Sequence, residues 1–405
     1  MQGRVTAKAC IIGAGLSGLS AAWHLAQAGV ETVVVEAHYP GHGASGRSGG
    51  QVLPGFGCSM GTLRAMMGEE AARRLWTLSV AAVALVKTLA EQLDIDCDLR
   101  HGHVICACHR RHAAALLSLQ ADLCEHYDHM TEYLDQDALR SHVDSPRYVA
   151  GLLDRQALHL HPLRFTLGLA RAAAAQGVRF FGDSPVVQLH HQDKRWLVRT
   201  PQGVVCSEQL FVCTNAYLHQ IAPRLAKPLM GYTLPVASAM LATEPLPPGL
   251  MPLPDGFSGH DSNWVVDYFR PTGDGRLLFG GRAWYGGAVP RDVLHMVRAR
   301  LLHVFPQLHD VAIHSAWGGL IAITATRMPH VGSLGGQGWF AHGFSGHGMA
   351  LSVLLGQAMA QAALGDESRF AAFAAVPQRR FPGGRLLAKP LVQLAMATAR
   401  LRDSL

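Results

Sequence analysis

The first forty residues follow two regular apolar patterns that predict a strand, a helix and a second strand. Cys10–Ile12 and Thr32–Val35 are short, continuous apolar runs, which are typical of parallel strands buried on both faces. Between them, Leu19–Ala28 has apolar residues at helical spacing, and Gly29 follows where a helix cap is expected. This order predicts a βαβ unit at the start of the chain.

The same two patterns predict strands interleaved with helices along the rest of the chain, which is typical of an α/β fold. Helices are expected at residues 61–93, 110–127, 163–176 and 292–305, and from about 349 to 364. Strands are expected at residues 98–107, 178–181, 186–189, 196–199, 209–215, 264–270, 276–279 and 339–341.

Composition and charge exclude several classes of protein. The net charge is +6, but the basic residues are scattered, so nucleic-acid binding is not expected. No run of about 18 apolar residues occurs, and residues 1–8 lack the apolar stretch of a secretory signal, so we expect a cytoplasmic protein. Residues 376–405 predict a basic C-terminal helix. We expect it to pack on the body of the protein, and contact with a membrane surface is the alternative.

Cysteine and histidine spacing indicates no metal site. The chain has 8 cysteines and 23 histidines, but neither residue type occurs at the spacing of a known ligand set. Cys106 and Cys108 lie on a predicted strand, where two small buried thiols in a reducing compartment are the simpler interpretation.

The turn between the first predicted strand and helix is suited to a dinucleotide. Gly13 permits the tight turn, Gly15 lets a pyrophosphate approach the backbone, and Gly18 lets the helix pack closely on the strand. The helix N-terminus adds free N–H groups and a positive dipole end. Glu36 ends the second strand, where a carboxylate can accept hydrogen bonds from ribose hydroxyls and would repel a 2′-phosphate. The unit therefore favours NAD or FAD over NADP.

Two further glycine-rich segments distinguish FAD from NAD. Residues 44–51 (ASGRSGGQ) and residues 343–349 (GFSGHGM) resemble the second and the C-terminal flavin loops of the D-amino acid oxidase–like family of FAD-dependent oxidoreductases. The resemblance spans nearly the whole chain and implies FAD as the cofactor. The residues it places at FAD are Gly13, Gly15, Leu16, Ser17, Gly18, Glu36, Ala37, Ala44, Ser45, Arg47, Ser48, Gly49, Gly50, Gln51, Val186, Thr214, Asn215, Gly343, Ser345, Gly346, His347, Gly348 and Met349.

The position of these segments predicts two domains. We expect a discontinuous Rossmann-type FAD-binding domain and a second, mixed-sheet substrate domain. The first comprises residues 1–79, 146–225 and 316–375, the second comprises residues 80–145 and 226–315, and the basic helix 376–405 follows.

Departures from other branches of the family narrow the range of expected substrates. Ile321 stands where amino acid oxidases of this fold carry an arginine for the substrate α-carboxylate, and Ala350 stands where sarcosine oxidases carry a lysine. No cysteine lies near Trp317 to link the flavin, so the resemblance implies non-covalent FAD. The chain resembles the branch that oxidises γ-glutamylated amines, and the departures favour a longer amine over a simple amino acid.

The resemblance also implies a chemistry and a set of residues near the flavin ring. We expect Gln51, Tyr268, Trp317 and His347 there, with Ile321 in the substrate wall. Arg270 shares a strand face with Tyr268 and is predicted to meet a distal carboxylate, with a surface arginine as the alternative.

The reaction implied for this site is amine oxidation. It takes place by hydride transfer to the flavin and hydrolysis of the imine, with dioxygen reduced to hydrogen peroxide. A dehydrogenase that uses a quinone or carrier protein, or a flavoprotein subunit without turnover, is the alternative. The sequence makes no prediction about oligomeric state.

Overall fold

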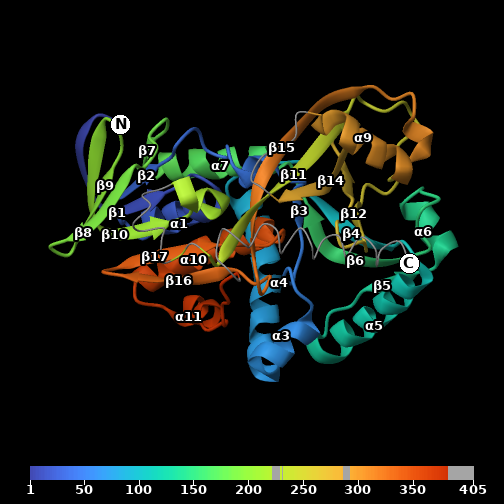
Figure 1. Cartoon of the computed structure of the whole chain (residues 1–405), viewed down its shortest axis with the longest axis horizontal. Coiled ribbons are helices and arrows are strands. Elements are labelled where there is room, and N and C mark those ends of the chain that lie inside the picture. The colour runs from blue at the N-terminus through green and yellow to red at the C-terminus, as the bar shows by residue number, and fades with distance from the viewer. Residues whose placement is uncertain (221–228, 230, 286–291, 382–405) are drawn as a thin grey trace.

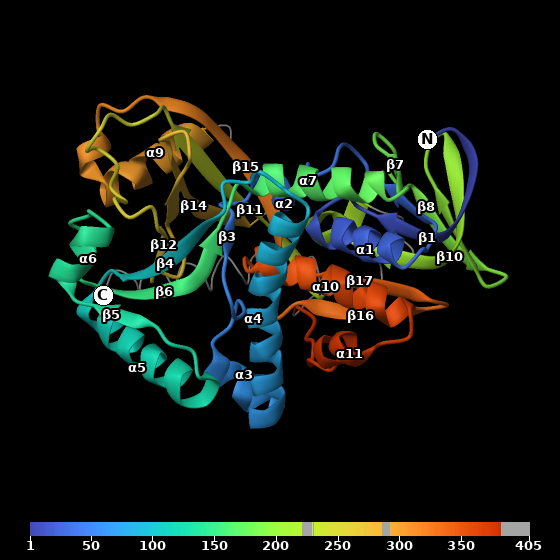
Figure 2. The same cartoon turned by 180° about the vertical axis from the view of Figure 1, so that it is seen from behind.

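The computed structural model of the chain describes residues 1–220, 229, 231–285 and 292–381. Its strands form two sheets that lie side by side, with helices against both (Figures 1 and 2). The interleaving of strands and helices confirms the predicted α/β class.

The first sheet has parallel strands at its centre, as the continuous apolar runs predict. Its order is β16-β17-β10-β1-β2-β7, and the β8–β9 hairpin extends from β10. Strand β1 pairs in parallel with both β2 and β10, so the carboxyl ends of these strands meet at one edge of the sheet. The strands are β1 (Gly3–Ile12), β2 (Thr32–Val35), β7 (Arg179–Phe181), β8 (Gln188–Gln192), β9 (Arg195–Arg199), β10 (Gly203–Val212), β16 (His330–Gly335) and β17 (Gly338–His342).

Helices α1 and α10 pack closely against each other beside this sheet. A Cβ atom at Gly356 of α10 would lie 2.3 Å from the carbonyl oxygen of Ser17 in α1, so no larger residue permits this approach. The helices around the first sheet are α1 (Leu16–Gln27), α4 (Glu69–Gln92), α7 (Pro162–Ala175), α10 (Gly348–Ala363) and α11 (Ser368–Ala374). No single described helix is long and apolar enough to span a membrane; α10 and α11 pass that test only as a pair bent by 118°.

The second sheet is mixed, because β12 pairs in parallel with β4 while its other neighbouring strands are antiparallel. Its order is β15-β11-β14-β13-β12-β4-β6-β3, with β5 on β6. Phe269, Phe279 and Phe305 pack together beneath it, with α9 on that side. The strands are β3 (Gln51–Val52), β4 (Arg100–Ala107), β5 (Glu132–Leu134), β6 (Ala150–His159), β11 (Thr233–Thr243), β12 (Ser258–Asp261), β13 (Tyr268–Pro271), β14 (Leu277–Tyr285) and β15 (Ile313–Thr324). The remaining helices are α2 (Ala44–Arg47), α3 (Met60–Met67), α5 (Arg110–Tyr127), α6 (Gln136–His142) and α9 (Val293–Val304), with 3₁₀ turns η1 (Asn215–Gln220) and η2 (Pro306–Leu308).

The sheets divide the chain differently from the predicted ranges. Strands β3, β6 and most of β15 fall in segments assigned to the FAD-binding domain, but all three belong to the second sheet. The strand expected at 264–270 begins only at Tyr268. The predicted basic helix 376–405 lies outside the described residues from residue 382 onward.

Candidate functional site

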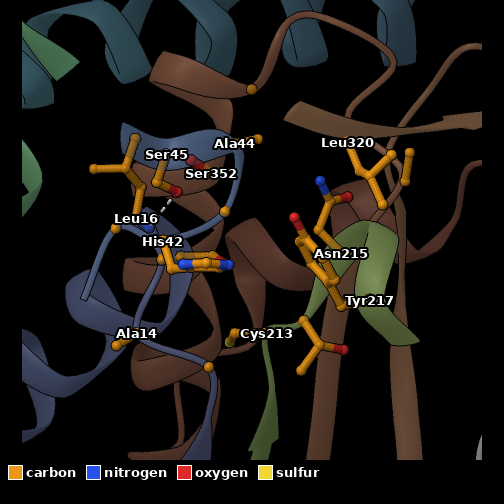
Figure 3. Close-up of a pocket in the computed structure, with 18 of the residues that line it drawn as sticks. Ala14, Leu16, His42, Ala44, Ser45, Cys213, Asn215, Tyr217, Leu320 and Ser352 are labelled. Atoms are coloured by element: carbon orange, nitrogen blue, oxygen red, sulfur yellow. Dashed lines mark hydrogen bonds between the residues drawn. The ribbon is translucent and has the colours of Figure 1, made fainter. Parts of the chain in front are cut away.

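A cavity of about 1340 Å³ lies at the edge where β1, β2 and β10 end. Its wall combines the turn after β1, the segment after β2, α2, η1 and the start of α10. Figure 3 shows Leu16, Ser45 and His42 on one side of this cavity and Asn215 and Tyr217 on the other. Segments from both ends of the chain therefore enclose one space, which we call the cofactor cavity.

The N-terminus of α1 faces the cofactor cavity. The helix begins at Leu16 with no side-chain cap and no acidic residue in its first turn, so its positive end is not neutralised. The N–H of Leu16 donates to Ser45 Oγ at 2.9 Å, which ties α2 to this turn. Gly18 lies outside the cavity lining and acts by packing, since a Cβ atom there would lie 2.0 Å from the carbonyl oxygen of Gly13. This geometry suits a bound pyrophosphate.

The Glu36 carboxylate is held against the glycine turn in the wall of the cofactor cavity. One carboxylate oxygen accepts from the N–H of Ala14 at 2.8 Å and the other accepts from the N–H of His38 at 3.0 Å. These bonds fix the carboxylate at the cavity wall, where its remaining lone pairs can accept from ribose hydroxyls.

Two buried polar atoms of the cofactor cavity have no hydrogen-bond partner among the described residues. His42 Nδ1 and Thr214 Oγ1 are both buried and unsatisfied, and both residues line the cavity. Buried polar atoms without a partner are costly, so these two atoms indicate a polar ligand. Asn215 lines the same wall and accepts from the N–H of Gly343 at 2.9 Å, which joins η1 to the C-terminal flavin loop. Gly343 itself is not part of the lining. The donors, acceptors and helix ends fit a dinucleotide such as FAD.

A second cavity, of about 1590 Å³, adjoins the first. Six residues line both cavities, so the two spaces meet along this shared wall. These are Ala44, Ser48, Ile321, Ser345, Gly346 and Met349. We call the second space the substrate cavity.

Hydrogen bonds fix the loop and the aromatic side chains that wall the substrate cavity. Gly50 has φ of +80°, and a Cβ atom there would lie 2.0 Å from the carbonyl oxygen of Leu160. Gln51 Nε2 donates to the carbonyl of Gly259 at 2.9 Å. The Trp317 indole N–H donates to the carbonyl of Arg47 at 2.9 Å, and the Tyr268 hydroxyl lies 3.2 Å from Ser238 Oγ. These side chains are therefore pre-positioned.

Neutral histidines line one side of the substrate cavity. His347 caps α10, and burial lowers its pKa to about 4. Burial and the neighbouring His347 lower the pKa of His260 to about 4. His260 Nδ1 lies 2.6 Å from His103 Nε2, and His103 Nδ1 lies 2.8 Å from Ser258 Oγ. At neutral pH the imidazoles can act as hydrogen-bond partners without adding charge to the cavity.

The two cavities bring together nearly all the residues that the sequence places at FAD and substrate. Gly13, Gly15, Leu16, Ser17, Glu36, Ala37, Ser45, Val186, Thr214, Asn215 and Gly348 line the cofactor cavity alone. Arg47, Gly49, Gly50, Gln51, Tyr268, Trp317, His347 and Ala350 line the substrate cavity alone.

The structure contradicts one of the two interpretations of Arg270. Its side chain is only 1% exposed, so it is not a surface arginine, and it does not belong to the lining of either cavity. Its Nε donates to the carbonyl of Gly49 at 2.7 Å and its Nη1 to the carbonyl of Pro271 at 3.1 Å. Burial lowers its pKa to about 10, against the effect of Asp98, whose carboxylate lies 3.8 Å away. Arg270 supports the flavin loop of residues 44–51 from behind through Gly49, and its Nη2 is buried without a partner among the described residues, so a contact with a distal carboxylate stays a prediction.

Several lining residues were missed by the sequence analysis. Tyr217 could have been found, because it follows Asn215 directly in the predicted polar turn. His260 and Arg327 carry no local signal, because β12 was not predicted and the long β15 that leads to Arg327 was not recognised. Trp264 begins the strand expected at 264–270 but was not assigned to the site. Among the described residues, no group of three or more His, Cys, Asp and Glu side chains could hold a metal ion.

Comparisons with known proteins agree with this geometry. The family model described as FAD dependent oxidoreductase (DAO) matches residues 8–362. Gamma-glutamylputrescine oxidoreductase of Escherichia coli is 36% identical over 99% of this chain and 94% of its own length. A probable oxidoreductase OrdL of Haemophilus influenzae is also 36% identical, over 94% of this chain and 88% of its own.

Solved structures share the fold at low sequence identity. Glycine oxidase from Geobacillus kaustophilus aligns with a TM-score of 0.79 at 19% identity, covering 93% of this chain and 99% of that one. L-proline dehydrogenase from P. horikoshii aligns with a TM-score of 0.73 at 18% identity, covering 93% and 96%. The match of the family model over most of the chain, together with the dinucleotide geometry, shows that this chain belongs to the DAO family of FAD-dependent oxidoreductases.

Proposed function

We propose that the chain oxidises a primary or secondary amine whose reacting carbon carries no carboxylate, with FAD held non-covalently. The observation that carries this proposal is the position of Ile321. It lines both cavities and therefore lies where substrate and flavin meet, with Ala350 also in the substrate wall. A carboxylate beside the reacting carbon would meet apolar side chains there, and burying it without a partner is costly. The E. coli relative named for γ-glutamylputrescine supports the same substrate class.

The wall of the substrate cavity favours the neutral form of the amine. The described residues that line it include no aspartate or glutamate, and its charged members are Arg47 and Arg327. An ammonium group there would have no counter-ion and would face two cations, so its pKa should fall. His260 and His347 are neutral and can accept a hydrogen bond from the amine N–H.

FAD bound in the cofactor cavity supplies the two-electron acceptor for conversion of the C–N bond to an imine. Tyr268 and Trp317, each held by a hydrogen bond, orient the amine and narrow the space open to water. The imine hydrolyses to an aldehyde in water. With dioxygen as the final acceptor, one amine, one dioxygen and one water give an aldehyde, ammonia or a smaller amine, and hydrogen peroxide.

The cysteines support non-covalent FAD and a reducing compartment. All eight are free, and none lines the substrate cavity. Cys213 lines the cofactor cavity, but burial raises its pKa to about 12, so it stays a thiol. We therefore propose a cytoplasmic enzyme whose FAD leaves the denatured polypeptide. Colour that remains with acid-precipitated protein would contradict non-covalent binding.

Anaerobic stopped-flow bleaching of the flavin tests the substrate class. Amines with an unsubstituted reacting carbon, including γ-glutamyl-capped diamines, should reduce the flavin at least about tenfold faster than glycine, sarcosine or D-amino acids, a difference of about 1.4 kcal/mol at the barrier. Faster bleaching by any of those amino acids would overturn the proposal. A peroxide assay with and without an artificial acceptor then distinguishes an oxidase from a dehydrogenase, and the absence of bleaching by every substrate would indicate a flavoprotein without turnover.

A further inference from the structure

Arg327 is a cation of the substrate cavity. Its position is fixed by the C-terminal flavin loop, residues 343–349. It follows β15 in a turn and has φ of +63°, a left-handed conformation that non-glycine residues adopt rarely and often at functional sites. The N–H of Thr324 donates to Ser345 Oγ at 3.2 Å, and Thr324 Oγ1 donates to the carbonyl of Met328 at 2.7 Å. These bonds join the turn that carries Arg327 to Ser345, which lines both cavities.

The guanidinium of Arg327 has no acidic partner among the described residues. No ion pair to an aspartate or glutamate of residues 1–220, 229, 231–285 or 292–381 is formed, and no such side chain lines the substrate cavity. The guanidinium carbon lies 5.7 Å from the ring centroid of Trp264, within the range of a cation–π contact. Arg47, the other cation of the wall, is already bonded to the carbonyls of His42 and Gly318.

Trp264 places this pair at the open end of the cavity. Its side chain is 59% exposed although it also lines the cavity, so it marks the mouth. Ile321 lies at the flavin-facing part of the cavity, because it is shared with the cofactor cavity. A substrate that extends from the flavin to the mouth would therefore have its reacting amine among neutral residues and its distal end beside Arg327.

We propose that Arg327, stacked on Trp264, binds a carboxylate at the end of the substrate distal to the oxidised amine. The inference rests on the proposed amine oxidation and adds the substrate class: an amine joined through a chain or amide to a free carboxylate, as in a γ-glutamyl amide. A planar guanidinium suits a carboxylate because it can donate two parallel hydrogen bonds. A free diamine would bring a second ammonium to this cation and would bind poorly.

A binding experiment with unreactive ligands tests the carboxylate site separately from turnover. The ligands are γ-glutamyl-n-butylamide, which lacks the reacting amine, and its α-methyl ester, which also lacks the carboxylate. Dissociation constants are measured by perturbation of the flavin absorbance of the holoenzyme. The wild type should bind the acid at least about tenfold more tightly than the ester. R327Q should reduce that ratio to within about twofold, because the ligand carboxylate would lose its ionic partner at the mouth of the cavity.

A matched control is available in Arg155. Its guanidinium also stacks on an aromatic ring, 5.8 Å from the centroid of Phe257, but it lines neither cavity, so R155Q should keep the full ratio. W264L alters an exposed side chain and should lower the preference for the acid over the ester at least about threefold. This variant still tests the carboxylate site if R327Q fails to retain FAD.

Equal binding of acid and ester by the wild type would overturn the inference. So would a ratio that survives both R327Q and W264L, or one that R155Q abolishes equally. A clear carboxylate preference in a protein whose flavin no amine bleaches would leave the carboxylate site standing and refute the proposed oxidation instead.

Discussion

At the scale of single residues, the cofactor cavity depends on one carboxylate held in a fixed orientation. Both oxygens of Glu36 accept backbone N–H groups, from Ala14 and His38, so the side chain cannot turn away from the wall. E36R should weaken FAD binding at least about tenfold, since it removes charged hydrogen bonds worth about 1.5–3 kcal/mol and leaves the N–H groups of Ala14 and His38 without this acceptor. The dissociation constant of FAD is measured by the quenching of FAD fluorescence when FAD is titrated with apoprotein.

Glu31 provides the matched control for this substitution. It lies near the same strand, pairs with Arg179 and lines neither cavity, so E31R should bind FAD as the wild type does. Unchanged FAD affinity in E36R would show that Glu36 does not face the ribose.

Single residues also show which parts of the site can be predicted from sequence. Glu36 and the glycines of the first turn are set by contacts within one βαβ unit, so their spacing along the chain carries the information. Arg270 and Arg327 are both arginines beside strands, and only the three-dimensional packing makes the first a buried support of Gly49 and the second a wall of the cavity. Their roles were inaccessible to any local pattern.

At the scale of elements, the contact between α1 and α10 aligns two helix N-termini on the cofactor cavity. G356A would place a methyl group 2.3 Å from the Ser17 carbonyl and 2.9 Å from the Ala21 nitrogen, forcing the helices apart. Overpacking of this kind typically costs about 1–3 kcal/mol. We expect a lower midpoint in urea and weaker FAD binding, because both helix ends move.

The matched control is G61A, another glycine inside a helix. At Gly61 of α3 the nearest atom to an added Cβ is Arg64 Nη2 at 3.8 Å, so the substitution should be neutral or stabilise by up to about 1 kcal/mol. If G356A and G61A lowered the free energy of unfolding equally, close packing of α1 against α10 would not be the cause of the destabilisation.

Elements with strong local periodicity were predicted closely, and the others were not. The helix expected at 110–127 coincides with α5, and that expected at 163–176 differs from α7 by one residue. Strands β11, β12 and β15 were not predicted as such, because their alternation is broken by small residues and by polar side chains that face the substrate cavity. The alternation of apolar and polar residues is therefore weakest in the strands that line the site, where side chains are set by function.

At the scale of the whole molecule, buried neutral histidines should make the protein sensitive to acid. Burial lowers the pKa of His159, His330 and His347 to about 4, and it also lowers those of His103 and His342 well below the usual value for histidine. Below about pH 6.5 the unfolded chain binds protons that the folded chain does not, so the free energy of unfolding falls as the pH falls from 6.5 toward 4. Each such histidine contributes a slope of up to about 1.4 kcal/mol per pH unit.

Urea unfolding at several pH values between 7 and 4.5 measures this slope. H330Q removes one buried titrating group and should make the slope shallower, while H309Q, which alters an exposed histidine, should leave it unchanged. Stability that is flat between pH 6.5 and 4.5 would contradict the prediction.

The enclosure of the cofactor cavity by both ends of the chain has a consequence for biosynthesis. Strand β1 pairs with β10, Gly3 lying opposite Gly203, and residues at the start of α10, among them Gly348 and Met349, complete the wall. A nascent chain that has not yet exposed these residues outside the ribosome lacks one wall of the cavity and the helix that covers α1. We therefore expect FAD to bind only after α10 has emerged, and until then the apolar faces of the first βαβ unit that α10 covers stay exposed.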